Sequence, residues 1–465
     1  MPSNVNQSAD TIVAVSTPPG YSGIGVIRMS GPDSRDILAN IFMPSHGRTQ
    51  IPDRKALHGT VVDPQSKLVL DDGIALVMQG PRSYTGEDVV ELSLHGSPVV
   101  LDLVLRLLVR QGARPATRGE FTRRAFLAGR LDLVQAEAVI DLIEAAGPAG
   151  AEEARSRLDG SLSNRIVDLS AALKDIIAVM EAHMDFDDDD EDPAPDPEPS
   201  IRKVFAKMQA LGELSELGRV RREGIRTAVV GKPNVGKSTL FNALLRADRA
   251  IVTPYAGTTR DTLEERLVLG GVALNLCDTA GIRKHPDPVE TEGIRRTEEQ
   301  MAAADLILVV LDGSCAPDAE DAAVLARCRE ERTVVVINKT DLGLVVKSGD
   351  PALGPAGRPR MAVSAKTGEG LDALRRILAE SAQDMASLAP EQHAGGLNGR
   401  CLLLLEAAMV PLKTLLDDFA EHAIITPEIV SLEVRRALGP LEEITGERAD
   451  EGILERIFER FCVGK

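Results

Sequence analysis

The sequence predicts a protein of several domains: an N-terminal α+β domain, an all-α domain built from two separate chain segments, and an α/β domain inserted between those segments. The chain has 465 residues, which is more than a single hydrophobic core usually organises. Apolar residues recur at helical spacing before and after a central region, which instead alternates strand-like apolar runs with helical stretches.

The first part of the chain, residues 1–125, consists mostly of short β-rich runs such as residues 11–15 and 25–28. Glycine and proline separate these runs and signal turns at residues 18–20 and 31–33. This pattern predicts a compact α+β domain.

Two segments with a helical period flank the centre of the chain. In residues 126–222 apolar side chains recur three or four positions apart, first from Leu131 and then from Leu162, which predicts two long helices. A helical pattern resumes near Ile201, and residues 386–465 return to the same period. We therefore expect the two segments to form one helical domain.

An acidic segment at residues 185–198 interrupts the first helical part. It holds nine acidic residues and no basic one, with a proline at every second position from 193 to 199. Such a segment repels itself and cannot continue a helix, so it predicts a solvated loop. A surface spacer is favoured over a docking site for a basic partner.

Residues 223–385 alternate buried strands with helices, which is typical of a mostly parallel α/β sheet. The predicted strands lie at residues 227–230, 272–276, 305–311, 333–337 and 361–363.

A phosphate-binding loop follows the first of these strands, because residues 231–238 fit the pattern G-x4-G-K-[ST] and precede a helical run. The glycines let backbone N–H groups surround phosphates, Lys237 is expected to reach the β- and γ-phosphate oxygens, and the Ser238 hydroxyl to bind Mg²⁺. The predicted nucleotide contacts here are Asn234, Val235, Gly236, Lys237, Ser238 and Thr239.

A second phosphate element, Asp-Thr-Ala-Gly at residues 278–281, closes the next predicted strand. The Asp278 carboxylate can hold the metal through water, and the Gly281 N–H can approach the γ-phosphate. The predicted contacts are Asp278, Thr279, Ala280 and Gly281.

A base-recognition element follows the next buried strand at Asn338, Lys339 and Asp341. A carboxylate at Asp341 can accept both the N1–H and the exocyclic N–H of guanine, whereas adenine would leave it unpaired. After the last strand, a backbone N–H can bind the guanine O6 within Ser364, Ala365 and Lys366. These four motifs follow predicted strands in the order that a nucleotide site requires. Together they predict a Ras-like P-loop GTPase domain.

Two features of this predicted domain are unusual. Ile282 follows the Asp-Thr-Ala-Gly motif, where many small GTPases carry the glutamine that orients the attacking water. No arginine finger can be assigned, although Arg260 lies in the expected switch segment. In that segment Thr258 and Thr259 are candidates for metal contact.

Composition narrows the possible environments and partners. The formal net charge is −18, so a nucleic-acid partner would need a local basic face. Five widely spaced cysteines without a CxxC pair argue against a disulfide framework or structural zinc. The N-terminus does not fit a signal peptide and no apolar run is long enough to span a membrane, so we expect a cytoplasmic protein without a membrane partner.

Beyond these motifs, the chain resembles the bacterial family of tRNA modification GTPases called MnmE or TrmE over nearly its whole length. The motifs that carry the resemblance lie at residues 10–13, 17–20, 25–28, 84–88 with Glu91, 119–122, 124–127, 131–137, 443–446 and 461–465.

The resemblance implies an N-terminal domain that binds folate and dimerises, a helical domain from both flanks, and the inserted GTPase domain. It also implies a homodimer that works with the flavoprotein MnmG, in a heterotetramer or larger complex. That complex would add an aminomethyl or carboxymethylaminomethyl group to C5 of the wobble uridine of certain tRNAs. A 5-formyl- or methylene-tetrahydrofolate would supply the one-carbon unit, and the FAD and NADH of MnmG the redox chemistry.

The resemblance further implies roles for single residues. Dimerisation of two GTPase domains would shield a K⁺ ion that takes the place of the arginine finger. The family's K⁺ ligands fall on Asn234, Thr253, Tyr255 and Thr258, of which Thr253 and Thr258 also line the nucleotide. Its water-positioning glutamate falls on Glu290, which is expected to act with Lys237 and with Thr259, a second Mg²⁺ ligand beside Ser238.

For folate, the family's positions fall on Arg28, Glu91, Arg130 and Lys465. Cations can hold the glutamate tail or carbonyl groups, and a carboxylate can read the pterin amino edge. Arg130 departs from the family's frequent lysine, which keeps the charge and changes the geometry.

Three alternatives stay open at this point. The chain could be an RNA-binding switch GTPase of ribosome assembly without modifying activity, since similar GTPase domains occur there. Cys462 could be a reactive thiol or a small residue packed beside Phe461, and packing is favoured. His95 could line the folate site or be satisfied locally, and local satisfaction is favoured.

Overall fold

The computed structural model describes residues 10–45, 51–145, 147–185, 196–246, 264–269, 272–278, 301–346, 353, 358–387, 396–421 and 425–465. The chain divides into two compact units. One comprises Met1–Ile140, Arg157–Met208 and Leu403–Lys465, and the other Asp141–Ser156 and Gln209–Leu402.

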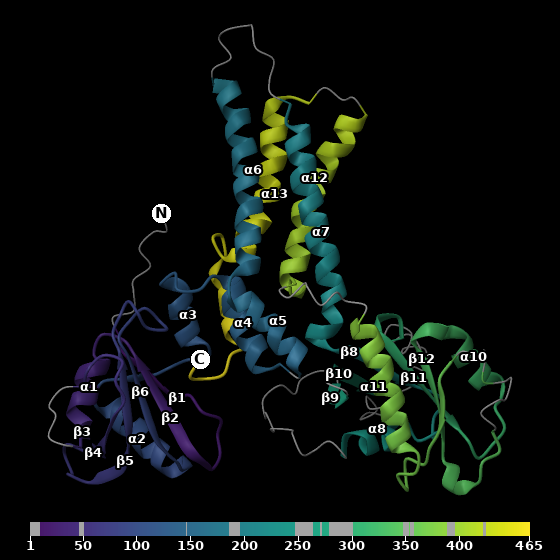
Figure 1. Ribbon diagram of the computed structural model, residues 1–465, viewed down its shortest axis with the longest axis horizontal. Helices are drawn as coiled ribbons and strands as arrows, with labels where there is room; N and C mark the ends of the chain where they lie inside the picture. The colour runs from purple at the N-terminus through teal and green to yellow at the C-terminus, as the bar shows by residue number, and fades with distance from the viewer. Residues whose placement is uncertain are drawn as a thin grey trace, which may run out of the picture. The chain divides into compact units, whose positions relative to one another are not determined.

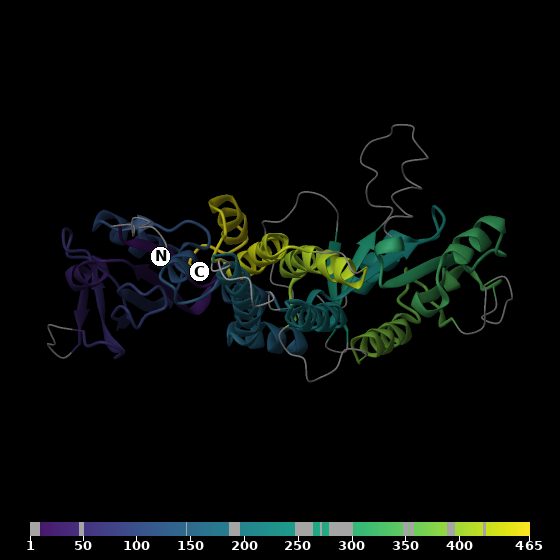
Figure 2. The same ribbon diagram turned by 90° about the horizontal axis from the view of Figure 1, so that it is seen from above.

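The first unit contains a seven-stranded sheet with the strand order β3-β4-β5-β6-β2-β1-β7 (Figure 1; Figure 2, purple). Neighbouring strands run antiparallel, except that β1 and β7 are parallel. The strands are β1 (Ile12–Val15), β2 (Ser22–Ser30), β3 (Phe42–Pro44), β4 (Leu57–Val62), β5 (Val69–Met78), β6 (Val89–Gly96) and β7 (Arg114–Pro115).

Helices α1 (Ser34–Ile41) and α2 (Pro98–Arg110) pack on one face of this sheet. Side chains alternate along β2, so Ile27 and Met29 enter the core beneath the helices and Arg28 points to the opposite face. The predicted α+β character of the N-terminal part is therefore confirmed.

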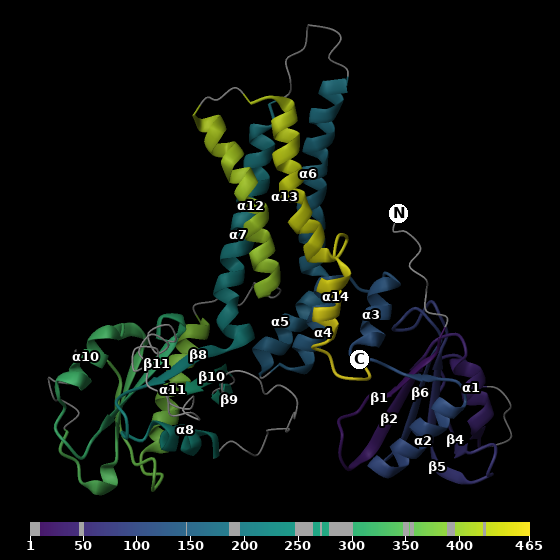
Figure 3. The same cartoon turned by 180° about the vertical axis from the view of Figure 1, so that it is seen from behind.

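The helical part draws on both flanks of the chain. Its helices are α3 (Glu120–Leu127), α4 (Leu133–Ile143), α5 (Pro148–Leu158), α6 (Ser161–Asp185), α7 (Glu198–Glu223), α12 (Gly399–Ala420), α13 (Pro427–Thr445) and α14 (Glu451–Phe458). Figures 1 and 3 show α6 and α13 side by side although about 250 residues separate them. Ion pairs join them, including Lys174 to Glu442 and Arg435 to Glu181.

One detail of the helical prediction was wrong. The apolar period from Leu131 predicted a long helix, but α4 has 11 residues and a separate helix, α5, follows it. Pro148 begins α5, and proline is favoured at a first helical turn and disfavoured in a helix interior. The predicted long helix from Leu162 is confirmed as α6, which has 25 residues.

The second unit contains a six-stranded sheet with the strand order β13-β12-β11-β8-β10-β9, parallel except between β9 and β10. Its strands are β8 (Ile225–Val230), β9 (Glu264–Leu269), β10 (Val272–Asp278), β11 (Leu306–Asp312), β12 (Thr333–Asn338) and β13 (Arg360–Ala362). All five predicted strands are present, and β9 was not predicted.

Helices cover both faces of this second sheet. On one face α8 (Lys237–Arg246) and α11 (Leu371–Ser387) share a core with the strands, and on the other face α10 (Ala319–Arg327) does so. The inserted α/β P-loop architecture is thereby confirmed. The domain boundaries at residues 125, 222 and 385 stay predictions, because the two compact units are divided differently.

Candidate functional site

Strand register brings the nucleotide motifs to one edge of the second sheet. Asp278 at the end of β10 pairs in parallel with Val229 of β8, two residues before the loop that begins at Gly231. Asn338 at the end of β12 pairs with Asp312 of β11. The carboxyl ends of these parallel strands are where ligands bind in open α/β sheets.

The loop after β8 is wrapped tightly around the Lys237 ammonium. Lys237 is 8% exposed, and its Nζ donates hydrogen bonds of 2.7 Å to the carbonyl oxygens of Gly231 and of Lys232. Three residues of this loop have positive φ angles: 145° at Gly231, 65° at Asn234 and 96° at Gly236. Such angles favour glycine, which has no Cβ. The loop thus has the left-handed turns that let successive N–H groups face a phosphate.

Asn338 joins the phosphate loop to the loop after β13. Its Nδ2 donates to the carbonyl of Val235 at 2.9 Å, and its Oδ1 accepts from the backbone N–H of Ala365 at 3.0 Å. The side chain is 2% exposed. The role of Asn338 is therefore to hold two nucleotide-binding loops together.

Asp341, the residue predicted to recognise the base, is held in place by Ser364. Its Oδ1 accepts a 2.7 Å hydrogen bond from the buried Ser364 hydroxyl, whose oxygen in turn accepts from the N–H of Thr367. The Asp341 side chain itself is exposed, which leaves carboxylate capacity for two N–H donors of a base.

Lys339 forms an ion pair with Asp312 at the end of β11, whose Oδ2 lies 2.7 Å from the Lys339 Nζ. Burial acts to raise the pKa of Asp312, but hydrogen bonds from Lys339 and Ser314 outweigh it and hold that pKa below its ordinary value. Asp312 was not singled out in the sequence, although an aspartate at the end of a buried strand is a signal of this position.

The structure brings together most of the predicted nucleotide residues that it describes. The phosphate loop and the first turn of α8 hold Asn234, Val235, Gly236, Lys237, Ser238 and Thr239. The base loops hold Asn338, Lys339, Asp341, Ser364, Ala365 and Lys366.

Other predicted residues lie outside the part of the chain that the structure describes. These are Thr253, Tyr255, Thr258, Thr259, Thr279, Ala280, Gly281 and Glu290. Asp278 is described only as the last residue of β10. All four K⁺ ligands, Asn234 included, the second Mg²⁺ ligand and the catalytic glutamate therefore stay predictions.

A second candidate site lies on the face of the seven-stranded sheet opposite α1 and α2, where Arg28 and Glu91 are cross-strand partners in β2 and β6. Arg28 Nε donates a 2.8 Å hydrogen bond to Glu91 Oε1, and Arg28 Nη2 lies 2.7 Å from the same oxygen. The guanidinium also lies 6.0 Å from the ring centroid of Tyr84 and 5.8 Å from that of Phe121. Phe121 is fully buried, so the partly exposed Tyr84 supplies the aromatic wall beside the charged pair, an arrangement that suits a planar, polar ligand.

The C-terminal residues complete this second site. Arg28 Nη1 donates to the carbonyl of Gly464 at 3.3 Å, and the Ser16 hydroxyl donates to the same oxygen at 3.2 Å. Lys465 is half-buried, so desolvation, and then the positive charge of Arg28, lowers the pKa of its ammonium. Arg28, Glu91 and Lys465 are thus brought together.

Arg130 is less closely tied to that group. Its side chain is exposed, and a Cβ built on Gly86 would lie 3.7 Å from Arg130 Cγ. Gly86 lies two residues from Tyr84, so Arg130 lies beside the loop that supplies the aromatic wall. Tyr84 opens the motif at residues 84–88, from which no ligand contact was predicted.

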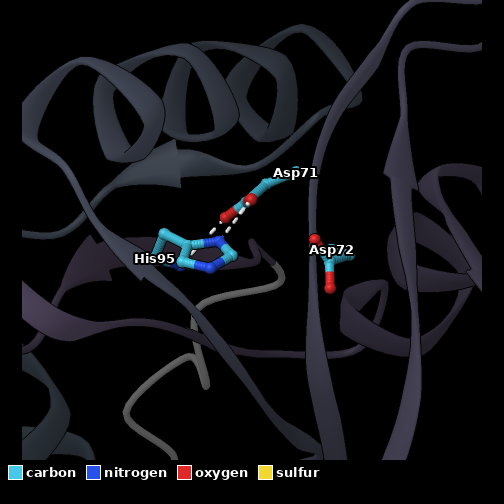
Figure 4. Close-up of side chains that lie close together, drawn as sticks. All are labelled: Asp71, Asp72 and His95. Carbon is cyan, nitrogen blue, oxygen red and sulfur yellow. Dashed lines mark hydrogen bonds and ion pairs between the residues drawn. The ribbon is translucent and has the colours of Figure 1, made fainter.

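His95 is satisfied locally by Asp71, which confirms the favoured alternative. Figure 4 shows its ring facing Asp71: Nδ1 lies 2.7 Å from Asp71 Oδ1, and the His95 backbone N–H donates to Asp71 Oδ2 at 2.9 Å. Asp72 pairs instead with His58 at 3.3 Å. Although Asp71, Asp72 and His95 could together offer metal ligands, these two ion pairs account for their proximity. Cys462 is partly buried, next to the buried Phe461.

Among the described residues, no helix combines the length and the apolar character that crossing a membrane requires.

Comparisons with known proteins match both units. A family model described as the GTP-binding protein TrmE N-terminus matches residues 11–130, and one described as the MnmE helical domain matches residues 133–462. The tRNA modification GTPase MnmE of Moorella thermoacetica is 41% identical over 461 residues, covering 98% of this chain and 99% of the relative. That of Heliobacterium modesticaldum is 42% identical over 466 residues, with the same two coverages.

Among solved structures, the G domain of the FeoB iron transporter of T. maritima is 26% identical, covering 34% of this chain and 99% of its own. Its TM-score is 0.27, which is too low to support a conclusion about the fold.

Proposed function

The chain belongs to the MnmE family of tRNA modification GTPases, and from that membership we propose that it hydrolyses GTP to drive modification of the wobble uridine of certain tRNAs. The proposed product carries an aminomethyl or carboxymethylaminomethyl group at C5, and the proposed partner is the flavoprotein MnmG. The observation that carries this proposal is the match of 98% of the chain to relatives named for that activity.

The geometry of the second sheet supports guanine nucleotides as the substrate. Lys237 and Ser238 stand at the start of α8, where a helix N-terminus favours phosphate. Asp341, fixed by Ser364, presents a carboxylate that suits the two N–H donors of guanine and not the N1 acceptor of adenine. Mg²⁺ would be held by Ser238 and Thr259.

We also propose that hydrolysis depends on K⁺ and on Glu290. Asn234, the one proposed K⁺ ligand that the structure describes, is exposed and has a φ of 65° within the phosphate loop. A monovalent cation there would neutralise charge on the phosphates in place of an arginine finger. Thr253, Tyr255 and Thr258 would complete its coordination when two GTPase domains meet in the homodimer.

The proposed folate site uses the second group of residues. Because the Lys465 ammonium is partly desolvated, an anionic partner would stabilise its charged form more than it would that of an exposed lysine. The glutamate tail of 5-formyl- or methylene-tetrahydrofolate is such a partner. Glu91 can accept from a pterin amino group, and Arg28 and Arg130 supply further donors. FAD and NADH would act in the partner protein.

The modifying role is tested by mass spectrometry of wobble uridines in a bacterial strain from which the gene for this chain has been deleted. Loss of the C5 group and its return with the wild-type gene are expected, whereas the Lys237→Ala gene should not restore it. Unaltered wobble uridines would instead favour the second candidate function, an RNA-binding switch GTPase of ribosome assembly.

The hydrolytic mechanism is tested by GTPase rates in KCl and in NaCl at equal ionic strength. Turnover should be faster in KCl, and Glu290→Ala should reduce it by about 10²-fold or more with little change in nucleotide affinity, if Glu290 acts only in the transition state. Glu292→Ala removes the same charge two residues further on and serves as the control. Equal rates in both salts contradict the cation mechanism.

A further inference from the structure

The side chain of Lys232, the second residue of the phosphate loop, is engaged by two carboxylates at the start of helix α10. Its Nζ lies 2.7 Å from Asp318 Oδ2 and 2.7 Å from Asp321 Oδ2. The Lys232 side chain is 16% exposed and that of Asp321 is 6% exposed. One ammonium thus serves two carboxylates, one of which is buried.

These two carboxylates are themselves rigidly placed. Asp318 is the N-cap of α10, where its Oδ1 accepts from the N–H groups of Glu320 and Asp321. Asp321 Oδ2 accepts in return from the Asp318 N–H at 3.1 Å, which closes a capping box. Lys232 is therefore held by side chains that the start of a helix has already fixed.

The backbone of the same lysine holds the phosphate-binding ammonium. The Lys232 carbonyl is one of the two oxygens that accept from Lys237 Nζ, and the carbonyl of Gly231 is the other. A shift of Lys232 would therefore move an acceptor of Lys237 directly. Two aspartates neutralise the Lys232 ammonium, so we do not expect it to bind phosphate as a further cation. Its effect on the phosphates comes from the position in which it holds the loop.

The connection between β11 and α10 reaches both halves of the nucleotide site. At its start Asp312 holds Lys339 of the base loop, and the Gly313 N–H donates to the carbonyl of Asn338 at 2.7 Å. At its end Asp318 and Asp321 hold the phosphate loop. This connection lies outside the motifs that identify the GTPase.

We propose that Lys232 is a positioning residue of the nucleotide site: paired with Asp318 and Asp321, it fixes the phosphate loop in the shape that presents Lys237 to the phosphates. The β11–α10 connection then acts as a brace that sets the distance between the phosphate loop and the base loop. The inference goes beyond the proposed function, because it assigns a role to residues outside the nucleotide contacts.

The first test compares binding of a fluorescent GDP analogue to the full chain and to two variants. Lys232→Ala removes the anchor and leaves two like charges unpaired, so we expect the dissociation constant to rise about tenfold. Lys232→Arg keeps the charge and the reach and should stay within about threefold of wild type. Wild-type affinity in Lys232→Ala overturns the proposal.

A second comparison separates positioning from a general structural role. In a Lys237→Ala background the ammonium that Lys232 positions is gone, so adding Lys232→Ala should change GDP affinity by less than about twofold. If Lys232→Ala costs the same factor with and without Lys237, the proposal is wrong and the ion pairs only stabilise the domain.

A third variant changes the two aspartates and leaves Lys232 in place. It replaces the first test if Lys232→Ala folds poorly. Asp318→Ser with Asp321→Asn keeps a capping hydroxyl and an amide oxygen for the helix start, while it removes both carboxylates. We expect this double variant to lose GDP affinity by about the same factor as Lys232→Ala. Full affinity in a folded double variant contradicts the brace.

Discussion

At the scale of single residues, His95 and Asp71 form a pair that raises the pKa of the His95 ring. The hydrogen bond that the His95 ring donates to Asp71, and then the negative charge of Asp71, raise the pKa of His95 above the ordinary 6.5. The folded chain therefore holds this proton more tightly than the unfolded chain does. The resulting stabilisation is fully present below pH 6.5 and is lost as the pH rises through the folded pKa.

We expect an NMR titration of the histidine ring protons to give His95 a pKa above 6.5 in the wild-type chain. Asp71→Asn removes both causes of the shift, so the pKa should fall back towards 6.5. Asp72→Asn removes only a weaker, more distant charge and should lower it less. An unchanged titration in Asp71→Asn would show that the pair does not form.

At the scale of elements, the sequence predicted those strands that are continuous apolar runs. β11 and β12 read as Leu-Ile-Leu-Val-Val-Leu and Thr-Val-Val-Val-Ile because both faces of a central parallel strand are buried. The edge strand β9 was missed because it opens with two glutamates and pairs on one side only. Helix α5 was missed because its apolar residues do not follow a clear helical period.

The tight approach of two loops in the second sheet leads to a prediction for Gly236. A Cβ at Gly236 would lie 2.3 Å from Asn338 Nδ2, which is the atom that bonds Val235. Gly236→Ala should therefore displace Asn338 and weaken GDP binding by about 10- to 100-fold, the equivalent of about 1–3 kcal/mol of local strain. Fluorescence titration with a GDP analogue measures this.

Gly343→Ala is the matched control for that substitution. Gly343 has a φ of 95°, close to the 96° of Gly236, and it also lies beside the base loop, but a Cβ there meets nothing within 4 Å. Gly343→Ala should lower the free energy of unfolding through backbone strain and leave GDP affinity nearly unchanged. Equal losses of affinity in both variants would show that strain, and not the contact with Asn338, is responsible.

At the scale of the whole molecule, local motifs predicted the nucleotide ligands, whereas the folate and K⁺ ligands were implied only by the family resemblance. The contacts between distant segments came only from the structure. The motif at residues 231–238 identifies phosphate binding because its chemistry is contained in eight neighbouring residues. In contrast, the pairing of Lys232 with Asp321 joins residues 89 positions apart, and no spacing in the sequence encodes it. Burial of Lys465 likewise depends on where the last residues lie.

The last residues of the chain contact the N-terminal part, more than 340 positions away in sequence. Arg118 Nε donates to the carbonyl of Phe461 at 3.0 Å, and Arg28 and Ser16 both donate to the carbonyl of Gly464. Gly464 has a φ of 98°, and a Cβ there would lie 2.6 Å from the Val15 carbonyl oxygen. The tail is therefore part of the proposed folate site.

Removal of residues 462–465 should weaken binding of 5-formyltetrahydrofolate at least about tenfold, because charged hydrogen bonds contribute roughly 1.5–3 kcal/mol each. Lys465→Gln removes only the ammonium and should cost less than the truncation, and Arg28→Ala should also reduce affinity. Isothermal titration of the full-length variants gives all three values.

Arg460→Gln provides the charge-matched control, because it removes an exposed cation five residues before Lys465. If net positive charge alone attracted the folate, this variant would lose affinity to the same extent as Lys465→Gln. We expect no loss, because Lys465 combines its charge with desolvation beside Arg28 and Glu91. Unchanged folate binding after truncation would instead remove the C-terminal residues from the site and leave Arg28 and Glu91 as a structural cross-strand pair.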